Sequence, residues 1–270
     1  MIYCNLKGGL GNIMFQIASA HHLSNLKNTD CCFPNFENHL EYANRRWHLQ
    51  YNKSSKFIND SLEYKNFINV NYKNFTLNRQ IKLYRYPFQY TDFLPEETDF
   101  AIDGYFQTEK YFIDSREDIL NIFKPSDKIN QLIDRKYKSI LEGNTISIHV
   151  RRGDYKGLPD YHPIQSTEYY KKSVKLLQPY DRCLIFSDDI DWCKTNMKIE
   201  RSVFIENEKD YIEMFLMSKC NHNIIANSAF SWWGAWLNQK NNKVIAPKNW
   251  FGKSINHETK DIYCKNWITL

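Results

Sequence analysis

Two adjacent arginines are the residues with the clearest chemical meaning in this chain. The sequence His-Val-Arg-Arg-Gly-Asp at 149–154 follows the apolar stretch 145–150, which reads as a buried strand. Each guanidinium group offers a fork of fixed donors that matches phosphate oxygens in pairs. An isolated Arg-Arg pair is more often a surface ion pair, but its place after a buried strand favours a phosphate site. The candidate residues of that site are His149, Arg151, Arg152 and Asp154.

Two other predicted strand ends also carry polar side chains. One ends in adjacent carboxylates, which could accept from the N–H groups of a guanine edge or could cap the helix that follows. The other runs through hydroxyls into a helix start, where anion binding and simple N-capping are both compatible with the sequence. Because ligands of parallel α/β sheets bind beyond the carboxyl ends of the strands, the three ends together predict a nucleotide diphosphate site. The candidate donor-binding residues on these two ends are Ser187, Asp188, Asp189, Asn227, Ser228 and Ser231.

A glycine-rich turn opens the chain. The sequence Lys-Gly-Gly-Leu-Gly-Asn at 7–12 stands between the short strand 2–6 and an apolar stripe at helical spacing over 13–23. Strand, glycine turn and helix form the opening unit of an α/β domain. A nicotinamide-binding loop would need a third glycine where Met14 stands, so the sequence fits such a loop poorly.

The elements that must position these residues are clearest in the second half of the chain. Strands alternate there with helices, which predicts a parallel, doubly wound sheet. The expected strands are 145–150, 183–186, 202–205, 223–226 and 243–246, and the expected helices are 167–178, 189–197, 209–219 and 230–239.

The first half is less regular. A strand is expected at 101–107 and a helix from Asp114 to Pro125, followed by a polar helix over 126–142. Residues 35–100 show weak periodicity and receive no assignment. The boundary therefore falls near 125–144, and we expect an N-terminal domain at 1–135 and a C-terminal domain at 136–270.

Composition excludes several classes of protein. With 36 basic and 31 acidic residues the net charge is +5, and no run of like charges forms an arm for nucleic acid. No secretory signal or 18-residue apolar stretch is evident, and the seven cysteines lack a Cys-x-x-Cys pair. We expect reduced thiols and a cytoplasmic location, with peripheral contact at the inner membrane face compatible with the charge. No zinc motif is present, and no metal ligand is assigned.

Several segments together resemble the α1,2-fucosyltransferases, glycosyltransferase family eleven. The motif at 149–155 is similar to the signature of that family, and 8–16 is similar to its opening motif with a departure at Ile13. The resemblance spans residues 3 to about 250 in the family's order, and its remaining motifs lie at 104–112, 210–222 and 227–236.

The resemblance implies a GT-B fold, with two Rossmann-like α/β domains facing across a cleft. It implies inverting transfer of L-fucose from GDP-β-L-fucose to the 2-hydroxyl of a terminal β-galactoside of a surface glycan or oligosaccharide, without an essential metal. His149 would lie by the guanosine, Arg151 and Arg152 would hold the β-phosphate, and an Asp after the next strand would read guanine. The acceptor would be recognised within 35–100. The residues implied on the cleft or acceptor side are Gly9, Gly11, Asn12 and Gln16.

Three questions stay open at the level of sequence. The catalytic base could be Asp154, a carboxylate within 35–100, or no side chain at all. A metal-dependent GT-A transferase could use the Asp-x-Asp spacing of Asp189 and Asp191. A non-enzymatic carbohydrate-binding module is compatible with the 16% aromatic content, although such modules are usually β-sandwiches.

Overall fold

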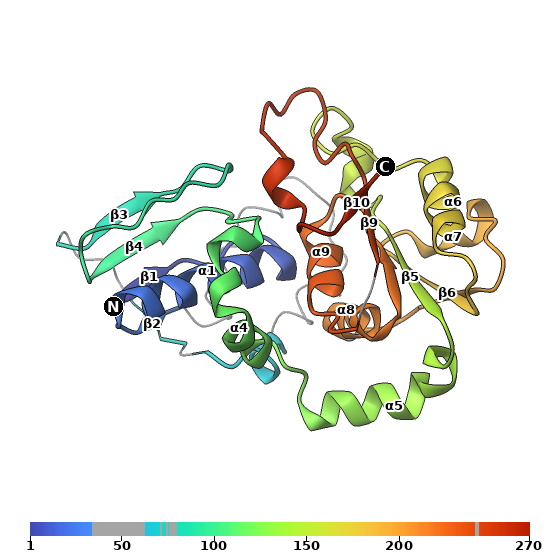
Figure 1. The fold of residues 1–270 in the computed structure, drawn as a ribbon, viewed down its shortest axis with the longest axis horizontal. Coiled ribbons are helices and arrows are strands. Elements are labelled where there is room, and N and C mark those ends of the chain that lie inside the picture. Colours follow the sequence, from blue (N-terminus) through green and yellow to red (C-terminus); the bar gives the residue numbers. More distant parts are fainter. Residues whose placement is uncertain (34–62, 71, 74, 76–79, 241–242) are drawn as a thin grey trace. The chain divides into compact units, whose positions relative to one another are not determined.

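The chain divides into two α/β units, each built on its own parallel sheet (Figure 1). The computed structural model describes residues 1–33, 63–70, 72–73, 75, 80–240 and 243–270. Much of 35–100, where the sequence permits no assignment and acceptor recognition is expected, therefore lies outside the described residues. Unit 1 comprises Met1–Ser126 with Glu258–Cys264, and unit 2 comprises Asp127–His257 with Lys265–Leu270.

The sheet of unit 1 has four described strands in the order β2-β1-β4-β3, and all neighbours are parallel. The apolar helix α1 (Leu10–Lys27) packs against β1 directly after the glycine turn, as predicted. Two strands of this sheet are absent from the prediction, because β2 is very short and β3 is mostly exposed at the sheet edge. The strands are β1 (Ile2–Cys4), β2 (Cys31–Cys32), β3 (Lys82–Arg85) and β4 (Phe100–Asp103).

Short helices complete unit 1. The helix expected from Asp114 begins with a 3-10 turn and continues as α4 (Arg116–Ile122). The 3-10 turns are η1 (Tyr64–Asn66), η2 (Glu109–Tyr111), η3 (Ile113–Ser115) and, in the returning C-terminal segment, η5 (Lys260–Ile262).

Unit 2 confirms the predicted doubly wound sheet. Its six described strands run in parallel in the order β10-β9-β8-β5-β6-β7, with α6 and α7 on one face and α8 and α9 on the other (Figure 1). The strands are β5 (Thr145–Val150), β6 (Arg182–Ser187), β7 (Ser202–Phe204), β8 (His222–Ile224), β9 (Val244–Ala246) and β10 (Ile268–Thr269). The helices are α5 (Asp127–Leu141), α6 (Thr167–Leu176), α7 (Ile190–Asn196), α8 (Asp210–Lys219) and α9 (Ala229–Trp236).

Helix α5 determines where the two units divide. Its buried side chains Ile129, Ile133 and Tyr137 recur every four residues and so share one face. That face packs on α8, and the Tyr137 hydroxyl donates to Glu208 at 2.5 Å. The division falls between Ser126 and Asp127, whereas the boundary predicted after residue 135 lies inside this helix.

None of the described helices is both long enough and apolar enough to span a bilayer.

Candidate functional site

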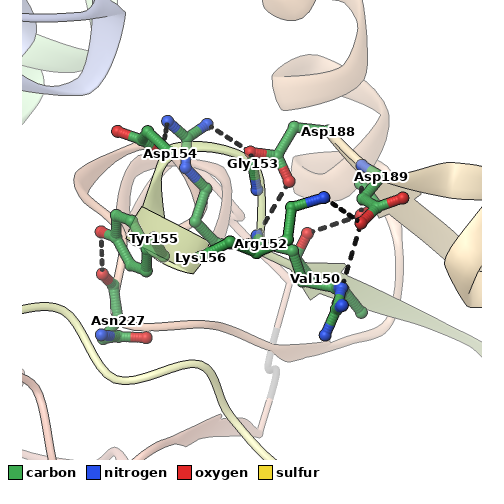
Figure 2. A network of polar contacts seen from close by, with 11 residues as sticks. Val150, Arg152, Gly153, Asp154, Tyr155, Lys156, Asp188, Asp189 and Asn227 are labelled. Carbon is green, nitrogen blue, oxygen red and sulfur yellow. Dashed lines mark hydrogen bonds and ion pairs between the residues drawn. The ribbon is translucent and has the colours of Figure 1, made fainter. Parts of the chain in front are cut away.

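The three predicted strand ends are neighbours in the sheet of unit 2. Strand β5 is buried along its whole length and lies between β6 and β8, so the segments that follow these strands leave the sheet at one edge. The arginine loop, which we define as residues 151–157, leaves β5 there and ends in the 3-10 turn η4 (Asp154–Gly157). Figure 2 shows its polar contacts with the end of β6.

Asp188 anchors the arginine loop. Its carboxylate accepts from the backbone N–H of Arg152 at 2.9 Å and from that of Gly153 at 3.0 Å. The guanidinium of Arg151 lies 3.1 Å from the same carboxylate. A Cβ atom on Gly153 would lie 2.5 Å from Asp188 Oδ2, so a larger residue would force the Asp188 carboxylate to move. Asp188 thus holds the loop, and the prediction that a carboxylate here reads guanine remains a prediction.

Arg151 is held between two carboxylates and an aromatic ring. Besides Asp188, its guanidinium lies 2.7 Å from Asp154 and 5.5 Å from the ring centre of Tyr155. The Tyr155 hydroxyl donates to the carbonyl of Asn227 at 2.8 Å, which ties the arginine loop to the segment after β8. With its side chain 32% exposed, Arg151 can still be reached by a ligand.

Arg152 is held more tightly. Its guanidinium carbon lies 3.7 Å from the ring centre of Trp192 in α7, and its Nε lies 3.2 Å from Asp189. Lys156 also contacts Asp189, at 3.0 Å. Partial burial opposes ionisation of Asp189, but the ammonium and guanidinium groups keep its pKa below the ordinary value.

Ser187 links the strand ends. Its hydroxyl donates to the carbonyl of Val150 at 2.8 Å and accepts from the backbone N–H of Asp189 at 3.0 Å. This serine therefore joins β6 to β5 at the point where both strands end. The arginine loop and Asp189 start from a fixed position as a result.

The charges of this described cluster balance. The three cations Arg151, Arg152 and Lys156 face the three carboxylates Asp154, Asp188 and Asp189, so the formal sum is zero. An anionic ligand must therefore share or replace carboxylate partners to reach the guanidinium groups. The geometry offers forked donors to phosphate oxygens without leaving an unbalanced charge when the site is free.

His149 is buried beside this cluster. The residue is 4% exposed and its ring lies 5.3 Å from that of Phe230. Its Nδ1 has no hydrogen-bond partner among the residues that the structure describes. Burial lowers the pKa of His149 to about 3; Asp188 opposes the shift and Arg151 adds to it. The imidazole is therefore neutral near pH 7, and its Nδ1 is enclosed by the protein.

The predicted residues after β8 make hydrogen bonds to other parts of unit 2. The Asn227 amide donates to the carbonyl of Trp250 at 2.9 Å and accepts from Gln165 at 3.0 Å. The Ser231 hydroxyl is buried and lies 3.3 Å from the carbonyl of Ser228. Ser228 is the N-cap residue of α9, but its side chain makes no capping hydrogen bond. Their predicted contact with a donor nucleotide is a proposal beyond these contacts.

The predicted residues of unit 1 shape the glycine turn. Gly9 is the N-cap residue of α1, and Gly11 is buried in its first turn. The Gln16 amide accepts from the backbone N–H of Lys7 at 2.8 Å and donates to its carbonyl at 3.0 Å, which clamps the turn. Asn12 accepts from Gln107 at 2.6 Å. An acceptor-side role for these residues stays a prediction.

Asp189 and Asp191, the carboxylates of the Asp-x-Asp alternative, do not form a shared metal site. Asp189 faces two cations, and Asp191 is 93% exposed beside Lys194 at 3.6 Å. Across the described part of the chain, no group of three or more His, Cys, Asp or Glu residues is placed to hold a metal ion.

Sequence reasoning missed several residues of the site. Tyr155 and Lys156 stand in or beside the recognised motif, and this adjacency was the available signal. Trp192 follows Asp189 by one helical turn, a weak signal that a sequence alone does not separate from core packing. His162, whose ring stacks on Tyr155 at 4.7 Å, gave no signal.

The whole chain, residues 1–270, matches the model of glycosyl transferase family 11. The chain belongs to this family. The family 11 chain is 30% identical over 314 residues to the O-antigen biosynthesis glycosyltransferase WbnK of Escherichia coli, with 100% of each chain covered. It is 33% identical over 274 residues to an α-1,2-colitosyltransferase of Escherichia coli, covering 93% of this chain and 92% of the relative. The predicted family is confirmed, and the non-enzymatic carbohydrate-binding module is wrong.

Solved structures of the same architecture support the fold of this family 11 enzyme. The NodZ α-1,6-fucosyltransferase soaked with GDP-fucose has a TM-score of 0.52 at 14% identity, with 87% of this chain and 92% of that chain covered. A family 9 glycosyl transferase from Veillonella parvula has a TM-score of 0.53 at 10% identity, covering 100% and 86%. The predicted GT-B-type fold with Rossmann-like α/β units is confirmed. The GT-A alternative, which requires a different fold, is wrong.

Proposed function

We propose that this glycosyltransferase moves L-fucose from GDP-β-L-fucose to the 2-hydroxyl of a terminal β-galactoside, with inversion at the anomeric carbon. The observation that carries the proposal is the arginine loop, in which two guanidinium groups are oriented by Asp154, Asp188 and Asp189. Two further facts support it: family membership and relatives named for α-1,2 transfer. The relative named for O-antigen biosynthesis favours a surface polysaccharide as the acceptor.

The proposed reaction matches the charges of the site. Cleavage of the sugar–phosphate bond leaves positive charge on the fucosyl ring and adds negative charge to the GDP oxygens. Arg151 and Arg152 would stabilise that negative charge more in the transition state than in the ground state. The neutral His149 would lie by the guanosine of the donor.

Asp154 is the carboxylate of the arginine loop that the sequence offers as a candidate catalytic base. Its contact with Arg151 at 2.7 Å favours a role in orienting that cation. A deprotonated acceptor hydroxyl would then depend on another group or on the departing phosphate.

A second donor is supported by one relative. The α-1,2-colitosyltransferase is 33% identical to this chain, and colitose is L-fucose without its 3-hydroxyl. A colitosyl donor would keep the same diphosphate contacts and would differ only around the sugar ring. Donor choice is therefore tested with both sugars.

The location follows the proposed acceptor. Growing surface glycans are carried on lipids, so we infer a cytoplasmic enzyme that meets its acceptor at the inner face of the membrane. Co-sedimentation with vesicles that carry anionic lipids would test this contact.

The first experiment measures GDP release from GDP-fucose with lactose added, in excess EDTA, with GDP-mannose as the control donor and GDP-colitose as the competing one. Lactose-dependent release from GDP-fucose but not GDP-mannose supports the donor, the reaction and metal independence together. Release from GDP-colitose alone would replace the proposed donor. If GDP itself fails to bind, the proposed function is wrong.

Arg152→Ala tests the assignment of the arginine loop. Removing this guanidinium should cost on the order of 3 kcal/mol of transition-state stabilisation, about a hundredfold or more in rate. The measurement is kcat/KM for GDP-fucose in a variant whose thermal unfolding matches that of the wild-type protein. Near-normal activity would contradict the assignment.

A further inference from the structure

The carboxyl edge of the unit 1 sheet carries a second polar constellation. Arg85 and Asp103 are the last residues of β3 and β4 and are paired in register. Lys7, in the glycine turn after β1, forms an ion pair with Asp103, and Arg85 lies 3.9 Å from the same carboxylate. Three strand ends thus place charged groups where open α/β sheets bind their ligands.

An aromatic ring stands exposed directly beside these charges. Tyr105 is 41% exposed, and the Lys7 ammonium lies 4.9 Å from its ring centre. The cation that pairs with Asp103 therefore also fixes the position of this ring.

The backbone is strained to produce this arrangement. Phe106, the next residue, has a φ of 52°, a left-handed conformation that is costly for a bulky side chain. In this conformation the Phe106 ring is buried, with its centre 5.1 Å from that of Tyr86 and 5.3 Å from that of Tyr111. The neighbouring Tyr105 side chain is exposed. Residues in such conformations persist only where the surrounding structure holds them in place, and they are enriched at ligand sites.

A second polar contact locks the two loops of this edge together. Gln107 donates to Asn12 at 2.6 Å, and Gln16 clamps the backbone of Lys7 from the other side. The exposed ring and the carboxylate are therefore presented by a fixed frame rather than by independent surface side chains.

The chemistry of this edge fits a neutral sugar. An aromatic face binds the apolar C–H face of a pyranose, and galactose has such a face because its axial 4-hydroxyl points to the other side. A carboxylate accepts hydrogen bonds from sugar hydroxyls. We propose that Tyr105 and Asp103 bind the acceptor galactoside, Tyr105 as the surface under the ring and Asp103 as the hydroxyl acceptor. This inference rests on the proposed function.

Tyr105→Ala is the direct test of the ring. The KM for lactose should rise about fivefold to tenfold, while Tyr105→Phe, which keeps the ring, stays close to wild type. The Kd for GDP reports on the donor site and should stay unchanged. The matched control is Leu26→Ala, which removes a 56% exposed apolar side chain at the other end of α1 from Asn12.

Asp103→Asn tests whether the carboxylate binds one particular hydroxyl of the galactoside. The variant should raise the KM for methyl β-galactoside, and the increase should vanish with the 3-, 4- or 6-deoxy analogue that lacks the bound hydroxyl. Equal losses on all three analogues would overturn the assignment of Asp103.

The outcomes separate this inference from the proposed function. Absence of GDP binding by the wild-type protein would overturn the proposed function. Galactoside transfer with an unchanged lactose KM in Tyr105→Ala would overturn the inference alone, as would a loss of GDP affinity equal to the loss of lactose affinity.

Discussion

Arg151 and Arg152 are neighbours in the chain, yet the fold holds their guanidinium groups in different ways. Arg151 lies between Asp154 and Asp188 with 32% of its side chain exposed. The guanidinium carbon of Arg152 lies 3.7 Å from the ring centre of Trp192, and the side chain is only 15% exposed. A guanidinium held against a ring has its direction fixed before a ligand arrives, which reduces reorganisation on binding. Trp192 thus positions Arg152.

Replacement of Trp192 tests this role. Trp192→Leu should lower kcat/KM for GDP-fucose about tenfold, because the cation–π contact is lost, whereas Trp192→Phe should retain most of the activity. Trp267→Leu removes an indole from the same unit outside the arginine loop and serves as the control. Equal activity of the Leu and Phe variants at position 192 would contradict the role.

His149 makes folding sensitive to acid. Its pKa is about 3 in the folded protein, against an ordinary value of 6.5. Between these values the unfolded chain binds a proton that the folded protein does not, so this contribution to stability is full above pH 6.5 and falls as the pH drops toward 3. His149→Gln should therefore lose less of its Tm than wild type between neutral pH and about pH 4.5. Thermal unfolding across that range measures this, and parallel curves would contradict it.

At the scale of elements, the arginine loop leaves β5 but takes its shape from the end of β6. Two backbone N–H groups of the loop meet the Asp188 carboxylate, and this approach leaves no room for a Cβ on Gly153. Gly157, at the end of the same loop, has no atom within 4 Å of an added Cβ. The two glycines differ in their surroundings within one short segment.

This difference gives a matched pair of variants. Gly153→Ala should push Asp188 away and lower GDP affinity about tenfold, because both the loop and Arg151 lose their anchor. Gly157→Ala should bind GDP as the wild type does. Calorimetric titration with GDP measures both, and equal affinities would show that the anchor is not needed for binding.

The sequence predicted the elements that bury apolar runs and missed those that do not. Strand β5 was predicted with its observed bounds, because all six of its residues are buried. Strands β2 and β10 have two residues each, and β3 is mostly exposed, so none of them has a usable pattern. In the site, motif residues were visible in the sequence. Trp192 was not, because its contact with Arg152 depends on how α7 folds back on the arginine loop.

At the scale of the whole molecule, the candidate donor residues and the candidate acceptor residues lie in different units. The arginine loop, Asp188 and His149 belong to unit 2, whereas Asp103 and Tyr105 belong to unit 1. Each unit has its own parallel sheet and its own buried residues.

Hydrogen exchange tests whether the donor nucleotide binds to unit 2. Saturating GDP should slow exchange in the peptides that contain the end of β5, the arginine loop and the end of β6, because binding stabilises the unit that holds the ligand. Peptides from β1 and β4 should change less. Stronger protection around 103–107 than around 150–157 would contradict the assignment of the donor to unit 2.

The chain passes between the two units three times, at 126/127, 257/258 and 264/265. The short segment Glu258–Cys264 belongs to unit 1, where Asp261 pairs with Lys110 at 2.6 Å, although it lies in the C-terminal part of the chain. Exchange of unit 2 between homologues by a single crossover near residue 126 would therefore also transfer Glu258–Cys264, which belongs to unit 1. A chimera built with a second and a third crossover around 258–264 keeps each unit whole.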